Sequence, residues 1–104
     1  MIGGRTVTKS EKELHNRIAS NGCIACRKDG NWNPVVSIHH IRGRTRKDAH
    51  KLVLPLCAQH HQQDDTDPLK RIGVHPFTAR FENKYGKQMD LLAEVMETIG
   101  EVDA

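Results

Sequence analysis

The sequence predicts a small α+β domain whose thin core is supplemented by a structural metal ion. The chain has 104 residues, and only 37% of them are apolar, which is little for a domain held by hydrophobic burial alone. Two short β-branched runs lie between stretches with helical patterns. The three cysteines and seven histidines can supply metal ligands, and an odd number of cysteines favours a metal over disulfides.

The length fits one domain, which we expect over residues 8–100. Residues 1–7 are predicted to be disordered, and residues 101–104 form a tail. The chain shows neither the apolar core of a signal peptide nor the roughly 18 apolar residues of a membrane span, so we expect a cytoplasmic protein without a membrane partner. In a reducing cytosol the cysteines stay available as thiolate ligands.

The first element predicted is a helix over residues 8–21. Ser10 and Glu13 have the spacing of a capping box at its start. Gly22 is suited to the position just after its end, because glycine readily adopts the left-handed conformation found there.

Two short strands are expected next. Residues 29–34 have turn chemistry, and the β-branched run at residues 35–39 fits a strand. A basic loop leads to a second β-compatible run at residues 51–56. Pro55 within that run favours an edge position or a strand end, because proline cannot donate to a β-ladder.

Three helices complete the predicted fold. The polar run from Cys57 predicts a helix that ends before Pro68, and a second helix is expected over residues 76–85. The third covers residues 87–99 and is closed by Gly100. Its apolar positions, which we assign to the core, are Leu91, Leu92, Val95, Met96 and Ile99.

A four-ligand metal site is the strongest motif in the sequence. Cys23 and Cys26 form a CxxC pair, and Cys57 and His60 form a CxxH pair about thirty residues later. Cys57 and His60 are three positions apart at a predicted helix start, so they project from one face. This spacing is typical of structural zinc sites. The alternative is that the cysteines are small buried hydrophobes.

A second metal site is indicated by the remaining histidines. His60 and His61 are adjacent, and neighbours on a helix point about 100° apart, so they serve different sites. His39 and His40 close the first strand, where side chains alternate between faces; both can line one site only if the strand ends or bends there, which Gly43 allows. Histidines around a divalent ion, with one neutral imidazole as base, suit phosphodiester hydrolysis.

The charge distribution favours a polyanionic partner. Residues 1–60 contain eleven Lys and Arg against four Asp and Glu, and residues 61–104 contain five against nine. The net charges are therefore +7 and −4. We interpret the basic run as DNA phosphate contacts of low sequence specificity, although such a run can also be only a solvated loop. The residues are Arg42, Arg44, Arg46, Lys47 and Lys51.

Together these motifs resemble the HNH (ββα-metal) endonuclease superfamily. Within it, the runs SIHHIRGRT (residues 37–45) and HKLVLPLCAQHH (residues 50–61) are similar to the phage Ref (recombination enhancement function) family. The resemblance covers residues 23–92. It implies a small HNH domain that is held together by a structural zinc ion and has flanking helices. The activity it implies is that of a RecA-dependent nuclease that cuts DNA at RecA-made displacement loops. It also implies a phage protein that works in the bacterial cytosol.

The resemblance also implies roles for individual residues. His39 and His61 match ligands of the catalytic metal, and His40 matches the general base. His50 lies near the place of the middle Asn of the HNH motif, about two residues further from the final histidine. Asp65, one turn beyond the helix histidine, is a further ligand candidate. Magnesium is the expected catalytic ion, and zinc can fill an all-imidazole site in a purified sample.

Two alternatives to a nuclease stay open. In one, the chain is a non-catalytic zinc module that binds DNA or RecA, and the extra histidines only pack. In the other it is a RecA-binding accessory protein without cutting activity. Ref proteins can carry a long basic N-terminal segment, whereas only about twenty residues precede Cys23 in this sequence. Two histidines remain. His75, in a turn, is close enough in the predicted fold to approach the second site, although a lone histidine in a turn is more often structural. His15 is expected to be exposed on the first helix.

Overall fold

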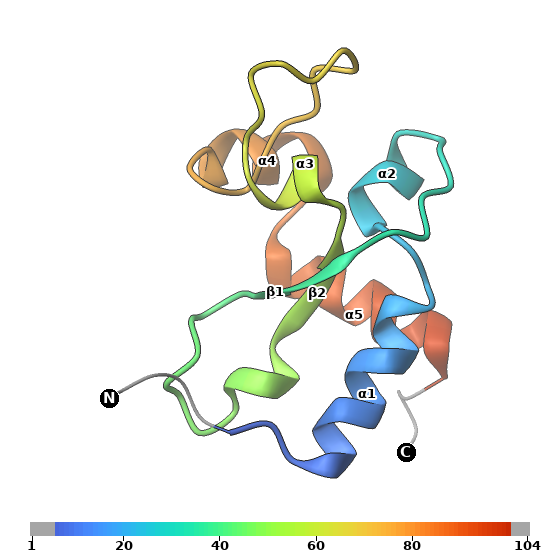
Figure 1. Cartoon of the computed structure of the whole chain (residues 1–104), viewed down its shortest axis with the longest axis vertical. Coiled ribbons are helices and arrows are strands. Elements are labelled where there is room, and N and C mark those ends of the chain that lie inside the picture. Colours follow the sequence, from blue (N-terminus) through green and yellow to red (C-terminus); the bar gives the residue numbers. More distant parts are fainter. Residues whose placement is uncertain (1–5, 101–104) are drawn as a thin grey trace.

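The computed structural model describes residues 6–100 and has at its centre a two-stranded antiparallel sheet surrounded by helices (Figure 1). The register pairs His39 with Leu54 and His40 with Val53. This confirms the predicted α+β class. The elements in chain order are α1 (Lys9–Ala19), α2 (Ile24–Lys28), β1 (Ser37–His40), η1 (Ala49–Lys51), β2 (Val53–Leu56), α3 (Ala58–His61), α4 (Thr78–Tyr85) and α5 (Gln88–Ile99).

The capping residue of α1 lies two positions before the predicted one. Thr8 is the N-cap: its hydroxyl accepts a hydrogen bond from the Glu11 amide at 3.1 Å, and the Glu11 carboxylate accepts one from the Thr8 amide at 3.0 Å. The capping box predicted at Ser10 and Glu13 is therefore wrong, because both pairs have the same spacing and only one lies at the helix start. Of the segment predicted to be disordered, residues 1–5 lie outside the described residues, as does the predicted tail.

The core forms around β2, which contacts α1, α2 and α5. All four residues of this strand are buried, including Pro55, which fits because either strand of a two-stranded sheet is an edge. Strand β2 is shorter than predicted, since residues 49–51 form the single turn η1 instead. The largest buried side chains packed around the strand include Ile18, Phe81, Leu91 and Val95.

Helix α3 is also shorter than predicted and ends at His61. After it the chain loops out and returns so that His75 pairs with Gln62 in an isolated parallel bridge. The His75 amide donates to the His61 carbonyl at 3.1 Å, and the Gln63 amide donates to the His75 carbonyl at 2.7 Å. Gly73 permits this contact, because a Cβ there would overlap the backbone nitrogen of Gln63.

The two C-terminal helices agree with the prediction apart from their first residues. Helix α4 begins at Thr78 rather than at residue 76. Helix α5 buries Leu91, Leu92 and Val95 and ends at Gly100, whose φ of 79° lies in the left-handed region. Within residues 6–100, no helix combines the length and apolar character that crossing a membrane requires.

Candidate metal centres

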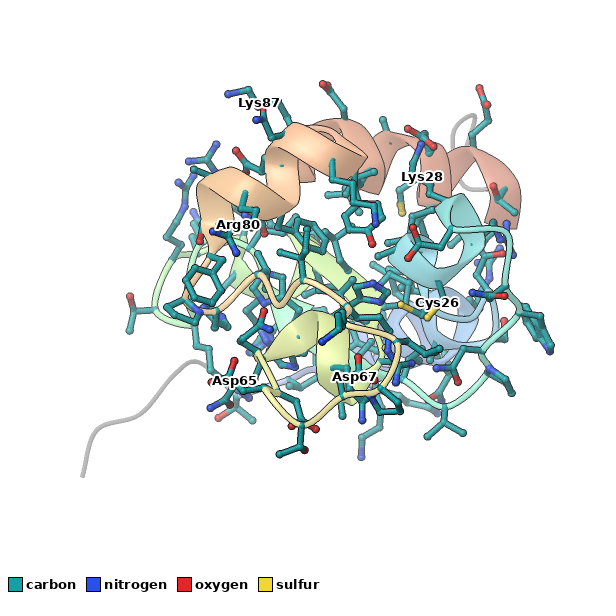
Figure 2. The ribbon with its side chains drawn as sticks, turned by 90° about the horizontal axis from the view of Figure 1, so that it is seen from above. Cys26, Lys28, Asp65, Asp67, Arg80 and Lys87 are labelled. Carbon is teal, nitrogen blue, oxygen red and sulfur yellow. The ribbon has the colours of Figure 1, made fainter. Side chains whose placement is uncertain are left out.

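The CxxC and CxxH pairs meet in one buried cluster. Cys23 caps α2 and Cys26 lies within it, while Cys57 caps α3 and His60 lies within it. All four side chains are at most 3% exposed. Figure 2 labels Cys26, whose sulfur lies beside another sulfur atom of this cluster. Two short helices, one before and one after the hairpin in the chain, thus present four donors to one point.

The donor atoms of this cluster have the spacing of a tetrahedral metal site. The Nδ1 atom of His60 lies 3.4 Å from the sulfurs of Cys23 and Cys57 and 3.5 Å from that of Cys26. The Cys26 and Cys57 sulfurs are 3.7 Å apart. Zinc–sulfur bonds of about 2.3 Å and zinc–nitrogen bonds of about 2.0 Å imply edges of about 3.5–3.8 Å. The residues therefore fit a metal ion such as zinc.

Hydrogen bonds around the cluster hold its ligands in place. The Nε2 atom of His60 lies 3.0 Å from the Tyr85 hydroxyl, which donates to the Asp29 carboxylate at 2.7 Å. Since the tyrosine proton goes to Asp29, His60 must donate through Nε2, and its Nδ1 lone pair faces the sulfurs. The amide of Asn33 also reaches the Cys26 sulfur at 3.7 Å.

The cysteine thiols of this cluster shift one another's pKa. A hydrogen bond between Cys23 and Cys57 raises the pKa of Cys23 and lowers the pKa of Cys57 to about 3. Burial raises the pKa of Cys26. A bound divalent cation would offset the cost of burying several thiolates together.

His39, His61 and His75 form a second cluster with metal-ligand spacing. His39 comes from β1, His61 from α3 and His75 from the returning segment that pairs with Gln62. The ring centroids are 5.1 Å apart for His39 and His61, 5.0 Å for His39 and His75, and 5.6 Å for His61 and His75. His39 is buried, and His75 is exposed.

In two of these three imidazoles, one ring nitrogen is hydrogen-bonded to a neighbouring side chain. The Nε2 atom of His39 lies 2.7 Å from the Oε1 atom of Gln88, and the Nδ1 atom of His61 lies 2.9 Å from the Ser37 hydroxyl. The Ser37 hydroxyl in turn donates to the Leu56 carbonyl, so it accepts from His61. Metal-bound histidines usually have such partners on the nitrogen that faces away from the ion.

Asp65, predicted as a further ligand, does not join these histidines in the described part of the chain. It is exposed in the loop after α3 (Figure 2). His75 lies beside His39 and His61 instead. Its position depends on the close contact at Gly73, and a glycine two residues before a histidine is too weak a signal to locate a ligand from sequence.

His15, His40 and His50 make a third cluster on the other side of β1. The Nε2 atom of His40 lies 3.0 Å from the Nδ1 atom of His50, and the Nε2 atom of His15 lies 2.7 Å from the His50 carbonyl oxygen. His15 is thus half-buried and hydrogen-bonded, and the prediction that it is exposed is wrong. No pattern in the sequence indicates that α1 covers this side of the hairpin.

The rings of His39 and His40 therefore belong to different clusters, as the alternation of a strand requires. Both residues nevertheless line one open hollow of about 320 Å³ at the end of β1. The strand ends at His40, and the chain turns there before Gly43, which also lines the hollow. Its other charged and imidazole residues are Arg44, His61 and His75.

Both strand histidines are held in their neutral form. Burial lowers the pKa of His39 to about 4, although its hydrogen bond to Gln88 acts in the opposite direction. Burial and the charge of Arg44 lower the pKa of His40 to about 4. Burial and the neighbouring His75 also lower the pKa of His61. At neutral pH these imidazoles have lone pairs that can bind a cation or accept a proton.

The basic residues between β1 and β2 are all exposed, as phosphate contacts need to be. Arg44 lines the hollow beside the histidines. Arg46 is paired with Asp48, its Nε atom lying 3.1 Å from the carboxylate, so part of its charge is already neutralised.

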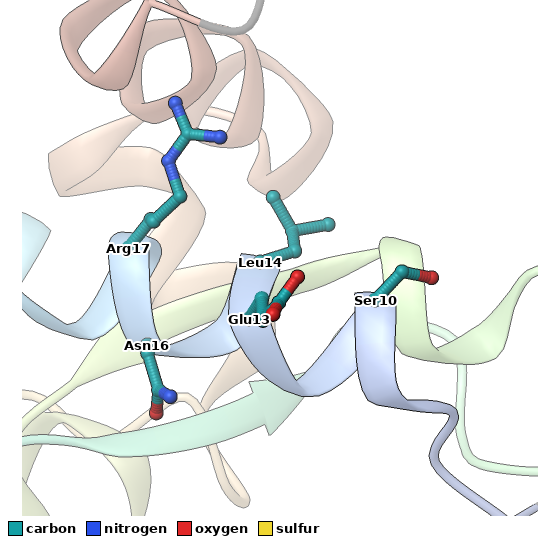
Figure 3. A pocket seen from close by; sticks show the side chains of 5 residues that line it. All are labelled: Ser10, Glu13, Leu14, Asn16 and Arg17. Carbon is teal, nitrogen blue, oxygen red and sulfur yellow. The ribbon is translucent and has the colours of Figure 1, made fainter.

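A larger hollow, of about 520 Å³, lies along α1 (Figure 3). It is open and is lined by one helix only. Arg17 at its edge donates to the Ile99 carbonyl at 3.1 Å, which ties α1 to the end of α5. None of its lining residues is a histidine or cysteine; they are Ser10, Glu13, Leu14, Asn16 and Arg17.

Comparison with known proteins identifies the family. A protein of Escherichia coli (strain K12) with the name "Uncharacterized protein YdfU" is 35% identical over 83 residues, which are 78% of this chain. The chain spans only 21% of the length of that relative. The model of the family described as "Recombination enhancement, RecA-dependent nuclease" matches residues 7–100. This match confirms the resemblance to the Ref family, and the chain belongs to the recombination enhancement (Ref) family of RecA-dependent nucleases.

Proposed function

We propose that this chain is a metal-dependent DNA endonuclease of the HNH type that cuts DNA at RecA-formed displacement loops during phage recombination in the bacterial cytoplasm. The observation that carries the proposal is the cluster of His39, His61 and His75 beside an open hollow that also contains His40 and Arg44. The two antiparallel strands are followed at once by a short helix, and histidines lie on β1 and on α3; this arrangement supports the ββα-metal assignment.

In this proposal the cysteine cluster holds a structural zinc ion. Its four ligands leave no open coordination position, which is typical of structural rather than catalytic zinc. The ion would join α2 to α3, and α3 contributes His60 to this site and the next residue, His61, to the other. A zinc ion bound by His60 would therefore help to hold α3, and with it His61, in place.

The catalytic divalent cation would be held by His39, His61 and His75, with His75 in the place first expected for Asp65. A cation there polarises the phosphate and stabilises the departing oxygen. Magnesium is the expected ion in the cell. Three imidazoles without a carboxylate bind transition-metal ions more tightly than magnesium, so zinc or manganese is also expected in purified protein.

His40 would act as the general base. If its Nε2–H donates to His50, its Nδ1 atom is left to accept a proton from water as the water oxygen attacks phosphorus. The bond from phosphorus to the leaving oxygen then breaks, and its electron pair stays on that oxygen. His50 would keep the ring of His40 in this orientation.

The exposed basic loop would hold the DNA backbone. Arg44 is placed to contact a phosphate at the hollow itself. Arg42, Arg46, Lys47 and Lys51 would add contacts along the strand without reading bases, so that the site of cutting is chosen by RecA pairing and not by this chain.

The proposal is tested with the purified full chain, magnesium or manganese, and supercoiled or single-stranded DNA. Each reaction is run with and without RecA filaments and a targeting oligonucleotide. A His40→Ala variant of equal zinc content and melting temperature is the control. We expect metal-dependent cutting that needs RecA and falls by about 10²–10⁴-fold in the variant.

Absence of cutting by the folded wild-type chain under all of these conditions, with binding to DNA or RecA intact, would contradict the proposal. The chain would then be a zinc-containing accessory module. Equal cutting by wild type and His40→Ala would instead refute the role of His40 as the base.

A further inference from the structure

The buried side of the His39 cluster is completed by two residues from the C-terminal helices. Gln88, the first residue of α5, is only 8% exposed. Its Oε1 atom lies 2.7 Å from the Nε2 atom of His39, and its amide nitrogen donates to the Glu82 carboxylate at 3.1 Å. Glu82, on α4, also has the ammonium group of Lys87 at 4.0 Å.

This chain of contacts admits one arrangement of protons. An ionised carboxylate such as Glu82 only accepts hydrogen bonds, so the NH₂ group of Gln88 must face it. The carbonyl oxygen of Gln88 then faces His39 and can only accept. His39 must therefore carry its proton on Nε2, and the lone pair of the neutral ring is on Nδ1.

We propose that Gln88 is a positioning residue of the metal centre: it fixes the Nε2–H tautomer of His39 and so presents the Nδ1 lone pair to the cation. The inference rests on the proposed function of the His39, His61 and His75 cluster. Gln88 does for His39 what the Ser37 hydroxyl does for His61. The negative charge of the Glu82 carboxylate polarises the Gln88 amide, and the more negative amide oxygen accepts a stronger hydrogen bond from His39. This makes the Nδ1 atom of His39 a better ligand.

The test separates this role from a merely structural one. Gln88→Met keeps the volume and removes both hydrogen bonds. The double variant Glu82→Gln with Gln88→Glu exchanges the two groups and keeps every donor and acceptor in the chain. Asn83→Met, which replaces an exposed amide side chain on α4, is the control. All are prepared with the cysteine site loaded, and each melting temperature is measured.

Two quantities are then compared across the variants. The first is the tautomer of His39 in protein without a second metal, read from the ¹⁵N shifts of its ring nitrogens. The second is the affinity for a second ion, measured with Co²⁺ alone by its visible absorption. For Gln88→Met we expect loss of the pure Nε2–H form and a Co²⁺ affinity about 10–100-fold weaker. We expect the exchanged pair to bind Co²⁺ at least as tightly as the wild type, and Asn83→Met to bind it equally well.

The outcomes distinguish the inference from the function on which it rests. If the wild type binds no second Co²⁺ ion, the proposed metal centre fails. If the wild type binds it and folded Gln88→Met binds it equally well with an unchanged tautomer, the centre stands and the role of Gln88 is refuted. Failure of the exchanged pair to restore affinity, with folding intact, would also overturn the role.

Discussion

The Nδ1 atom of His50 lies 3.0 Å from the Nε2 atom of His40, so a residue of η1 contacts the ring of a residue at the end of β1. His50 is itself only 2% exposed, and its carbonyl oxygen accepts a hydrogen bond from His15 on α1. The proposed base is thus oriented through a contact that links three elements of the fold.

Replacing His50 should therefore lower the rate of DNA cutting without changing metal binding. Without this hydrogen bond the His40 ring is free to rotate, and we expect His50→Ala to lower kcat by about tenfold, which is a fraction of the ~10²–10⁴-fold contribution of a general base. His50→Asn should retain more activity, because its amide oxygen can accept from His40. Single-turnover cleavage measures this, and equal rates for the wild type and His50→Ala would contradict it.

Tyr85→Phe should weaken the cysteine site. The phenylalanine ring keeps the packing against Phe81, whose centroid is 4.9 Å away, but removes the hydroxyl between His60 and Asp29. We expect zinc affinity to fall by about 10–100-fold. Competition with a chromogenic chelator measures the affinity. If Tyr85→Phe and the wild type release zinc at the same chelator concentration, the hydroxyl does not support His60.

Removing the metal from the cysteine cluster should unfold the domain. Apolar side chains are few, and apparent zinc binding energies in small zinc domains reach about 10–16 kcal/mol. We expect a chelator to abolish the helical circular dichroism signal, and added zinc to restore it. A metal-free protein that keeps a cooperative melt near the original temperature would mean that the core is sufficient alone.

His75→Ala and Asp65→Ala should differ sharply in metal binding. His75 lies in the histidine cluster, and Asp65 is exposed outside it. Removal of a direct ligand should weaken binding of the second ion by more than the ~10–100-fold typical of losing a ligand's hydrogen-bond partner. Asp65→Ala should bind as the wild type does. Calorimetric titration with Mn²⁺ distinguishes the two, and the reverse order of affinities would return Asp65 to the site.

Arg44→Ala should reduce DNA binding more than Arg46→Ala does. Arg44 lines the histidine hollow, whereas Arg46 already pairs with Asp48. Removing one side chain that neutralises a phosphate should lower the slope of log affinity against log salt by about 0.9. Arg80→Ala, on α4, is the control with the same change of side chain. Equal slopes for Arg44→Ala and the control would place the DNA elsewhere.

The sequence predicted those features that are encoded by spacing alone. The CxxC and CxxH pairs define their cluster because each pair is local, and the apolar repeat of α5 together with Gly100 defines that helix. The ends of elements were predicted less accurately, because a local pattern can fit two neighbouring positions. Thr8 with Glu11 and Ser10 with Glu13 satisfy the same capping pattern, and the structure has the first pair at the helix start.

The composition of the histidine clusters could not be predicted in the same way. His75 reaches His61 through a bridge between segments that have no common periodicity. Gln88 reaches His39 across 49 positions of sequence, and His15 reaches His50 across 35. Contacts of this kind depend on the tertiary placement of whole elements, for which a single sequence carries no pattern.

The proposed nuclease activity depends most on a cation held by His39, His61 and His75. Anomalous diffraction from crystals of the full chain soaked in Mn²⁺, recorded at the manganese and zinc absorption edges, tests this directly. We predict a zinc peak among Cys23, Cys26, Cys57 and His60, and a manganese peak among the three histidines. No peak at those histidines, or a manganese peak among His15, His40 and His50, would contradict the proposed centre.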